Sequence, residues 1–259
     1  MNDSTGTANA SIFTRLANPS RFIEIADRLI PWLAGFGLLV VAVGLIGGWL
    51  APEDYQQGAT VRIMYLHVPF AWLSMMIYGV MTLAALGTLI WRHPLADVSL
   101  KSAAPIGAVF TFLALFTGSV WGRPMWGTWW VWDARLTSVF VLFIIYLGLI
   151  ALTRATPEPG QAARASAIVT LVGALNLPII KFSVDWWNTL HQPASVFRAD
   201  GPTIAFSMLW PLLVSAIGFT LLFGALHLVA MRTEIWRRRV HTMRRVAAQR
   251  ADRSMRRVR

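Results

Sequence analysis

Residues 29–52 read LIPWLAGFGLLVVAVGLIGGWLAP and contain no Asp, Glu, Lys or Arg. A helix needs about 20 apolar residues, with a range of about 17–25, to cross the hydrocarbon core of a membrane. This run reaches that length. It is longer than the apolar region of a signal peptide and has no obvious cleavage site, so we interpret it as a membrane span.

Five further charge-free runs follow along the chain. They cover residues 63–91, 102–122, 136–153, 165–180 and 201–231. The run 165–180 is slightly short, but Lys181 can extend it by reaching toward the membrane interface. A large soluble bundle would carry a polar face on most helices, whereas these runs are apolar all round. The sequence therefore predicts an all-α integral membrane protein with six transmembrane helices.

Six spans place both termini on the same side of the membrane. The segments on that side carry eighteen Lys and Arg, eleven of them in the tail from Arg232 onward, and the opposite side carries five. Without the tail the ratio is seven to five, in the same direction. Because cytoplasmic segments are richer in Lys and Arg, we expect both termini in the cytoplasm. The predicted layout is a cytoplasmic N-terminal segment 1–28, a membrane domain 29–231 and a basic cytoplasmic tail 232–259.

The net charge of +11 comes largely from this tail. Such basic segments are typically solvated or lie against anionic lipid head groups, and no nucleic-acid-binding motif accompanies this one. We therefore expect membrane lipid as a partner and not nucleic acid. The chain also lacks the G-x-x-x-x-G-K-[ST] phosphate loop, which predicts that any ATP is hydrolysed by another protein.

Tryptophan is concentrated in one predicted outer segment. Residues 121–138 read WGRPMWGTWWVWDARLTS, and Trp186 and Trp187 lie in the last outer segment. An interfacial belt would place one or two Trp at helix ends on both faces of the membrane. The concentration instead favours a flat, apolar ligand on which indole rings stack, with Gly127 allowing close approach of the backbone. The five clustered tryptophans are Trp121, Trp126, Trp129, Trp130 and Trp132.

Charged residues accompany the tryptophans. Arg123 and Arg135 are candidates to pair with carboxylates on such a ligand, with Arg62 and Arg198 in reserve on the same side. Asp133 lies two residues before Arg135. The sequence leaves open whether Asp133 forms an ion pair with Arg135 or takes part in the ligand site.

Two of the five histidines, His67 and His191, belong to the predicted outer side. His67 lies about one turn inside the second span, where an ionisable residue is costly and by default functional. Two imidazoles beside stacking Trp rings make a plausible site for a six-coordinate haem iron. The chain has no cysteine, so any haem is expected to be held non-covalently. Sequence spacing alone does not show that the two imidazoles face each other.

The stretch 126–138, WGTWWVWDARLTS, is similar to the tryptophan-rich WWD signature of bacterial haem-handling proteins. Four further stretches occur in the order found in the cytochrome c maturation protein C (CcmC) family. They are YLHVP (65–69), APIGAVFTF (104–112), NLPII (176–180) and WWNTLHQ (186–192). The chain resembles that family from about residue 30 to about residue 192. It is too short for the larger haem lyases, which share the signature but have more spans.

The resemblance implies a multi-pass protein of the bacterial inner membrane whose periplasmic WWD loop, here about 121–136, presents haem b. It implies His67 and His191 as the axial ligands. It also implies delivery of haem to the periplasmic haem chaperone CcmE for cytochrome c biogenesis. The implied partners in a haem export complex are the ABC-type subunits CcmA and CcmB and the small membrane protein CcmD. The WWD signature maps onto Trp126, Gly127, Trp129, Trp130, Trp132 and Asp133.

Two other functions remain possible at the level of the sequence. A cytochrome b-type quinol oxidoreductase subunit would need paired histidines inside the spans, and His67 is the single candidate in their outer half. A transporter that conducts haem through itself would need polar groups along the spans, and Asn176 is among the few present. The sequence favours a haem-binding and haem-transfer protein over an enzyme.

Overall fold

The computed structural model describes residues 18–258, so the predicted N-terminal segment 1–28 lies partly outside the described residues. Within that range the chain is helical, and six of its segments are long and apolar enough to cross a membrane, which confirms the predicted fold class. A short 3-10 helix, η1 (Ala59–Ile63), precedes α3. The helices are α2 (Pro19–Leu50), α3 (Met64–Leu89), α4 (Ala96–Trp126), α5 (Ala134–Ala155), α6 (Pro159–Gly173), α7 (Asn176–Trp186) and α8 (Phe206–Val258).

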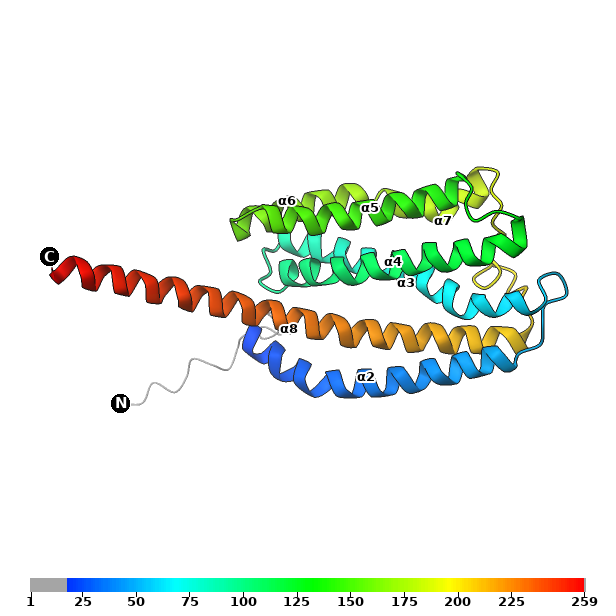
Figure 1. The fold of residues 1–259 in the computed structure, drawn as a ribbon, viewed down its shortest axis with the longest axis horizontal. Coiled ribbons are helices and arrows are strands. Elements are labelled where there is room, and N and C mark those ends of the chain that lie inside the picture. Colours follow the sequence, from blue (N-terminus) through cyan, green and yellow to red (C-terminus); the bar gives the residue numbers. More distant parts are fainter. Residues whose placement is uncertain (1–17, 259) are drawn as a thin grey trace.

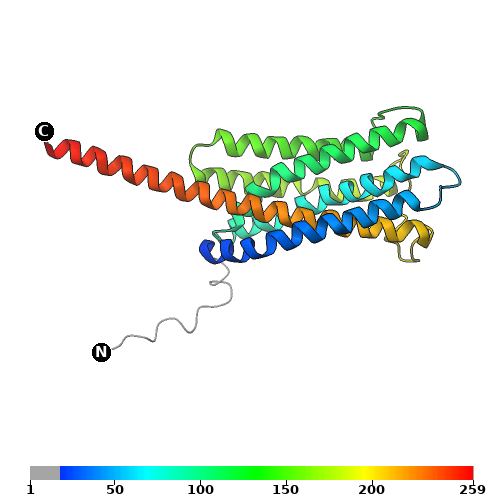
Figure 2. The same cartoon turned by 60° about the horizontal axis from the view of Figure 1, so that its bottom comes forward.

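The spans form a bundle of roughly parallel rods. Helix α8 packs along α2 on one side of the bundle, and α5 packs against α6 and α7 on the other (Figures 1 and 2). Helices α3 and α4 lie between these groups and pack against each other. The loop between α4 and α5 and the loop between α7 and α8 emerge at the same end of the bundle, so the two Trp-rich segments meet there (Figure 1).

The fifth span is two helices and not one. Helix α6 ends at Gly173, and α7 begins at Asn176. Pro178 has no backbone N–H to donate to the carbonyl of Ala174, and that carbonyl accepts instead from the N–H of Leu177 at 3.0 Å. The predicted run 165–180 looked short because it was bounded by the charged residues Arg164 and Lys181, and the helices extend past both. The two helices together cover Pro159–Trp186.

Helices α2 and α8 extend beyond the charge-free runs. Asn18 caps α2 by accepting the N–H of Ser20 at 2.9 Å, and Pro19 occupies its first turn, so the helix begins ten residues before the predicted span. Helix α8 continues through the basic tail because no Gly or Pro follows Gly224. Its end projects past the bundle (Figure 1).

Partly buried ion pairs hold the part of this projecting helix nearest the bundle. The ammonium of Lys101 in α4 lies 2.7 Å from the carboxylate of Glu234, and the guanidinium of Arg238 lies 2.6 Å from that of Asp97. Glu234 is buried. The part of the predicted tail nearest the membrane domain is therefore packed against α4, and residues 241–251 of the same helix are exposed.

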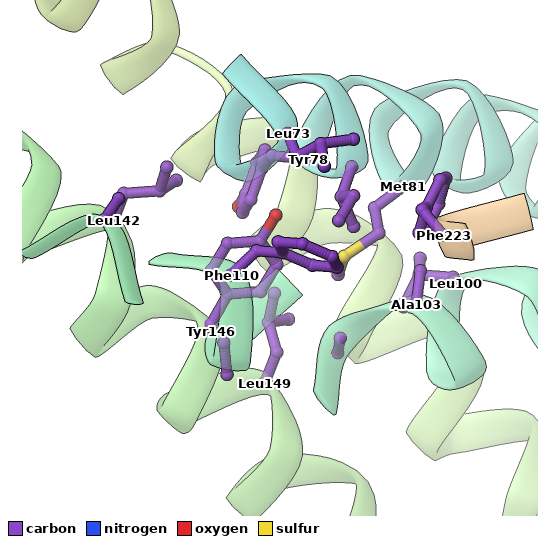
Figure 3. Close-up of a cluster of buried hydrophobic side chains, with 14 of the residues drawn as sticks. Leu73, Tyr78, Met81, Leu100, Ala103, Phe110, Leu142, Tyr146, Leu149 and Phe223 are labelled. Carbon is purple, nitrogen blue, oxygen red and sulfur yellow. The ribbon is translucent and has the colours of Figure 1, made fainter. Parts of the chain in front are cut away.

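Two tyrosines organise the core between α3, α4 and α5 (Figure 3). The hydroxyl of Tyr78 donates to the carbonyl of Thr170 at 3.1 Å, and that of Tyr146 donates to the carbonyl of Ser74 at 2.8 Å. Their rings meet edge to face, with centroids 5.3 Å apart. Buried hydroxyls in an apolar interior need such partners. These bonds tie α3 to α5 and α6, and they fill the middle of the bundle with side chains.

Candidate functional site

The predicted loop 121–136 is shorter in the structure. Helix α4 continues through Trp126 and ends at Gly127, whose left-handed φ of 76° suits glycine and whose N–H donates to the carbonyl of Arg123 at 3.0 Å. Asp133 caps the next helix by accepting the N–H of Leu136 at 2.7 Å. The irregular segment is therefore 127–133, and Trp121, Arg123 and Trp126 belong to α4. Gly127 serves as the helix cap that ends α4.

His67 lies in the first turn of α3 and faces α4. Its Nδ1 is 3.1 Å from the carbonyl oxygen of Ala114 and 3.1 Å from the hydroxyl of Thr117. That hydroxyl already donates to the carbonyl of Leu113, so it is an acceptor for the imidazole. Because both partners accept, Nδ1 carries the hydrogen and Nε2 keeps a lone pair. The imidazole ring also meets the edge of Trp121, with centroids 5.6 Å apart.

His191 lies in the loop between α7 and α8 and faces the segment 127–133. Its Nδ1 is 3.4 Å from Oδ2 of Asp133, and the same oxygen accepts the N–H of Leu190 at 3.3 Å. Its ring meets Trp126, with centroids 5.0 Å apart. Burial lowers the pKa of His191 below its ordinary value of 6.5, although Asp133 opposes the shift. The imidazole is therefore neutral near pH 7, with its hydrogen on Nδ1 and a lone pair on Nε2.

The two histidines form a matched pair. Each donates from Nδ1 to an acceptor, which is the arrangement that orients a metal-ligating imidazole and leaves Nε2 for the metal. Among the described residues no group of three or more His, Cys, Asp and Glu could hold a bare metal ion. The arrangement suits a metal that brings its own equatorial ligands, as haem iron does.

Some of the clustered tryptophans lie against the imidazoles, and others pack against α5 or are exposed. Trp121 and Trp126 lie against the two imidazoles. Trp130 and Trp132 pack edge to face with each other and with Phe140 of α5. Trp129 is 58% exposed. The structure thus brings two of the five predicted Trp to the histidine pair, and the other three lie on the outside of the segment 127–133.

Asp133 and Arg135 take different partners, so the ion pair left open by the sequence is not their main contact. Asp133 binds the amides and imidazole described above. The guanidinium of Arg135 donates to Ser183 Oγ at 3.0 Å and to the carbonyl of Lys181 at 3.3 Å, both in α7. Arg123 is exposed and donates to the carbonyl of Gly127.

The reserve arginines, Arg62 and Arg198, lie outside the segment 127–133. Arg62 pairs with Glu53 at 3.8 Å and stacks over the ring of Trp49. Arg198 is exposed in the loop that follows His191. Of the four basic candidates, Arg123 is therefore the best placed for a ligand carboxylate, since it is exposed beside the segment 127–133.

Sequence reasoning missed the face of α4 that supports His67. Ala114 and Thr117 hold the imidazole, and a Cβ added to Gly118 would lie 2.9 Å from its Cε1 atom. Trp121 completes the same face. Residues 114, 117, 118 and 121 follow one another at steps of three, one and three, which places them on one side of a helix. The sequence therefore contained this pattern. What it could not show was that this side faces His67.

The chain is similar to known proteins over most of its length. The family model described as Heme exporter protein C matches residues 12–246. The chain is 66% identical over 235 residues to the Heme exporter protein C of Bradyrhizobium diazoefficiens, covering 91% of this chain and 89% of that protein. It is 51% identical over 222 residues to that of Escherichia coli K12, covering 85% and 89%. It is 45% identical over 225 residues to that of Paracoccus denitrificans, covering 86% and 93%.

Proposed function

The chain belongs to the Heme exporter protein C family, and from that premise we propose that it binds haem b non-covalently at the periplasmic face of the bacterial inner membrane and passes it to the haem chaperone CcmE. The family name and the six spans support a multi-pass bacterial membrane protein with a role in haem export for cytochrome c maturation. That role is transfer rather than catalysis. We propose in addition the periplasmic face, the recipient CcmE and the two histidine ligands.

One observation carries the proposal: two imidazoles from distant parts of the chain share one end of the bundle, and neither Nε2 has a hydrogen-bond partner among residues 18–258. His67 and His191 are brought together by the packing of α4 against α3 and by the contact of Asp133 with the loop after α7. A bis-imidazole haem is the cargo that this pair fits. Trp121 and Trp126 supply ring surface beside it.

The orientation of the chain supports a periplasmic site. The histidines lie at the end of the bundle opposite the basic root of α8, which the excess of Lys and Arg assigns to the cytoplasm. The partners we propose are CcmE as recipient, CcmA and CcmB as ABC-type subunits and CcmD as a small membrane subunit. The exposed outer face of the segment 127–133 leaves room for a recipient to reach the haem edge.

The competing functions find less support in the contacts. A quinol-oxidising cytochrome b would need further histidine pairs, and His227 pairs with Ser99 at 3.0 Å toward the other end of the bundle. A conducting channel would need an open polar interior, whereas Tyr78, Tyr146 and their neighbours fill the core (Figure 3). Asn176 donates to the carbonyl of Ser138 at 2.8 Å, which is a structural role at the break between α6 and α7.

The proposal is tested by the optical spectrum of the purified full chain titrated with haem, followed by addition of the chaperone CcmE. We expect one low-spin bis-imidazole haem per chain and its appearance on the chaperone. Two haems per chain that are reduced by quinol would instead establish the cytochrome b alternative.

Replacing Asp133 with Asn should weaken haem binding by about 10–100-fold, the usual effect of losing a group that orients a metal ligand. The side-chain oxygen of Asn can still cap α5, but its N–H₂ would donate to Nδ1 of His191. The hydrogen of the imidazole would then move to Nε2 and block ligation. The measurement is a haem titration. Asp200→Asn is the control, since Asp200 is exposed in the same loop as His191. Equal affinities in the two variants would contradict the role of Asp133.

Replacing Arg123 with Gln should lower haem affinity about tenfold to a hundredfold without changing the axial spectrum. A charge-assisted bond to a carboxylate contributes about 1.5–3 kcal/mol, and haem carries two propionates. Arg154→Gln is the matched control, because Arg154 lies in the last turn of α5, at the end away from the segment 127–133. If the double variant Arg123→Gln, Arg135→Gln retained as much haem as the parent, pairing of either arginine with the propionates would be ruled out.

A further inference from the structure

An aromatic groove lies between α4 and α5 on the outside of the bundle, next to the segment 127–133. Its volume is about 450 Å³, within the range of about 300–1,000 Å³ typical of small-molecule sites. Ser119 is the one hydroxyl in its wall. Six aromatic side chains line it: Phe112, Phe116, Trp130, Trp132, Phe140 and Phe143.

The groove is distinct from the histidine pair. Phe112, Phe116 and Ser119 recur at steps of four and three residues, so they share one face of α4. The residues of α4 that hold His67, Ala114 and Thr117 among them, lie on the opposite face. Phe112 and Phe116 are 52% and 57% exposed on the surface that a bilayer would cover. The groove therefore faces the lipid.

The walls of the groove suit a flat aromatic molecule better than acyl chains. Phe112 and Phe116 present nearly parallel rings, with an interplanar angle of 20° and centroids 6.3 Å apart. Phe143 tilts toward Phe112 from the facing helix at 6.1 Å. At the end of the groove near the segment 127–133, Trp130, Trp132 and Phe140 meet edge to face. Aromatic groups gain specific stability from stacked and edge-to-face contacts with such rings.

An unused hydrogen-bond donor lies at the same end. The Nε1 atom of Trp130 is buried and has no partner within the described part of the chain. A buried indole N–H without an acceptor is costly, so this position calls for a ligand with an oxygen acceptor at the depth of the head groups. A molecule with a flat aromatic body and a carboxylate at one edge would satisfy both the rings and the indole. That description fits a porphyrin.

We propose that this groove is a lateral haem-entry site, at which a haem dissolved in the outer half of the bilayer docks before it reaches His67 and His191. This inference rests on the proposed function and adds the direction from which the cargo arrives. The segment 127–133 borders both places: Trp130 and Trp132 close the groove, and Trp126 and Asp133 lie against His191. A haem that leaves the groove past this segment reaches the imidazoles without entering water.

The test compares two haem donors. The full chain in lipid nanodiscs receives haem either from phosphatidylcholine vesicles or from aqueous haem–albumin, and the growth of the low-spin spectrum is timed. Ser119→Phe fills the groove, and the double variant Phe112→Leu, Phe116→Leu removes its stacked rings while keeping apolar volume. Phe36→Leu, at an exposed site on α2, is the control.

We expect the Phe112→Leu, Phe116→Leu variant to take up haem from vesicles about thirtyfold more slowly than the parent, as the loss of two aromatic contacts predicts. Ser119→Phe should slow the same uptake because it fills the groove. In both variants the final low-spin spectrum and the uptake from albumin should be unchanged. Uptake from vesicles at the parental rate in both variants would show a groove filled only by lipid. Equal slowing with both donors would show damage to the histidine site and would also overturn lateral entry. A parent chain that never shows a low-spin spectrum would refute the proposed function itself.

Discussion

Alanine at His67 or at His191 is expected to abolish the low-spin haem spectrum of this protein. In the proposed site each imidazole supplies one of the two axial ligands, so either substitution should leave a five-coordinate, high-spin iron. The structure predicts the same outcome for both positions because each Nε2 is unused and each Nδ1 is held by an acceptor. Added imidazole should restore the low-spin spectrum by occupying the vacated axial position. The measurement is the optical spectrum of purified, haem-loaded variants.

His93 and His241 provide matched controls for this experiment. His93 accepts the N–H of Leu95 at 3.3 Å in the loop between α3 and α4, and His241 is exposed on α8. The loop between α3 and α4 and the projecting part of α8 lie at the end of the bundle opposite the loop between α4 and α5 (Figure 1). The alanine variants of both histidines should keep the parental spectrum. If His67→Ala and His191→Ala both kept it as well, the axial pair would be wrong.

Removing two outward tryptophans is expected to reduce haem transfer to the chaperone about thirtyfold while haem stays bound. Trp129 and Trp130 lie in the segment 127–133 without contacting either imidazole ring, so the double alanine variant should retain the low-spin spectrum. Two lost aromatic contacts of about 1 kcal/mol each correspond to that factor. Stacking spread over several rings can be lost stepwise, which suits a carrier that must release its cargo. The measurement is haem-loaded CcmE in membranes holding equal amounts of variant and parent.

This prediction separates a transfer platform from a membrane anchor. Asp133 stays intact in the variant, since its loss would disturb both the cap of α5 and His191. Trp32 and Trp91 are exposed near the opposite end of the bundle, and their double alanine variant controls for loss of interfacial tryptophan. Normal chaperone loading by the Trp129, Trp130 variant would refute the platform. Loss of the variant protein from the membrane would show that these rings are anchors.

The sequence indicated which residues could form the site, but not the bounds of the loop or the contacts between the residues. The sequence predicted that the Trp cluster and the two outer histidines share one side of the membrane, and in the structure each of these histidines lies beside a Trp of the cluster. The expected loop 121–136 was too long. The Trp and Gly residues were taken as loop residues, whereas α4 continues through Trp126 and ends at its cap, Gly127. Asp133 was a candidate site residue from the sequence, but its contact with His191 joins positions 58 residues apart, and no local pattern predicts such a contact.

The sequence by itself determined the six spans, because the length of an apolar run and the cost of burying charge are local properties of the chain. It also determined that any haem is held without cysteine, whereas the break of the fifth span into α6 and α7 appeared only in the structure. Only the tertiary structure decided which faces of the helices meet. The packing of α4 against α3 gives His67 its acceptors, and the return of the loop after α7 brings His191 to Asp133. The same packing turns Trp121 and Trp126 toward the imidazoles and Trp130 and Trp132 toward the lipid. A one-dimensional pattern assigns residues to faces of a helix, and the neighbour of each face is decided by how the whole bundle buries its surface.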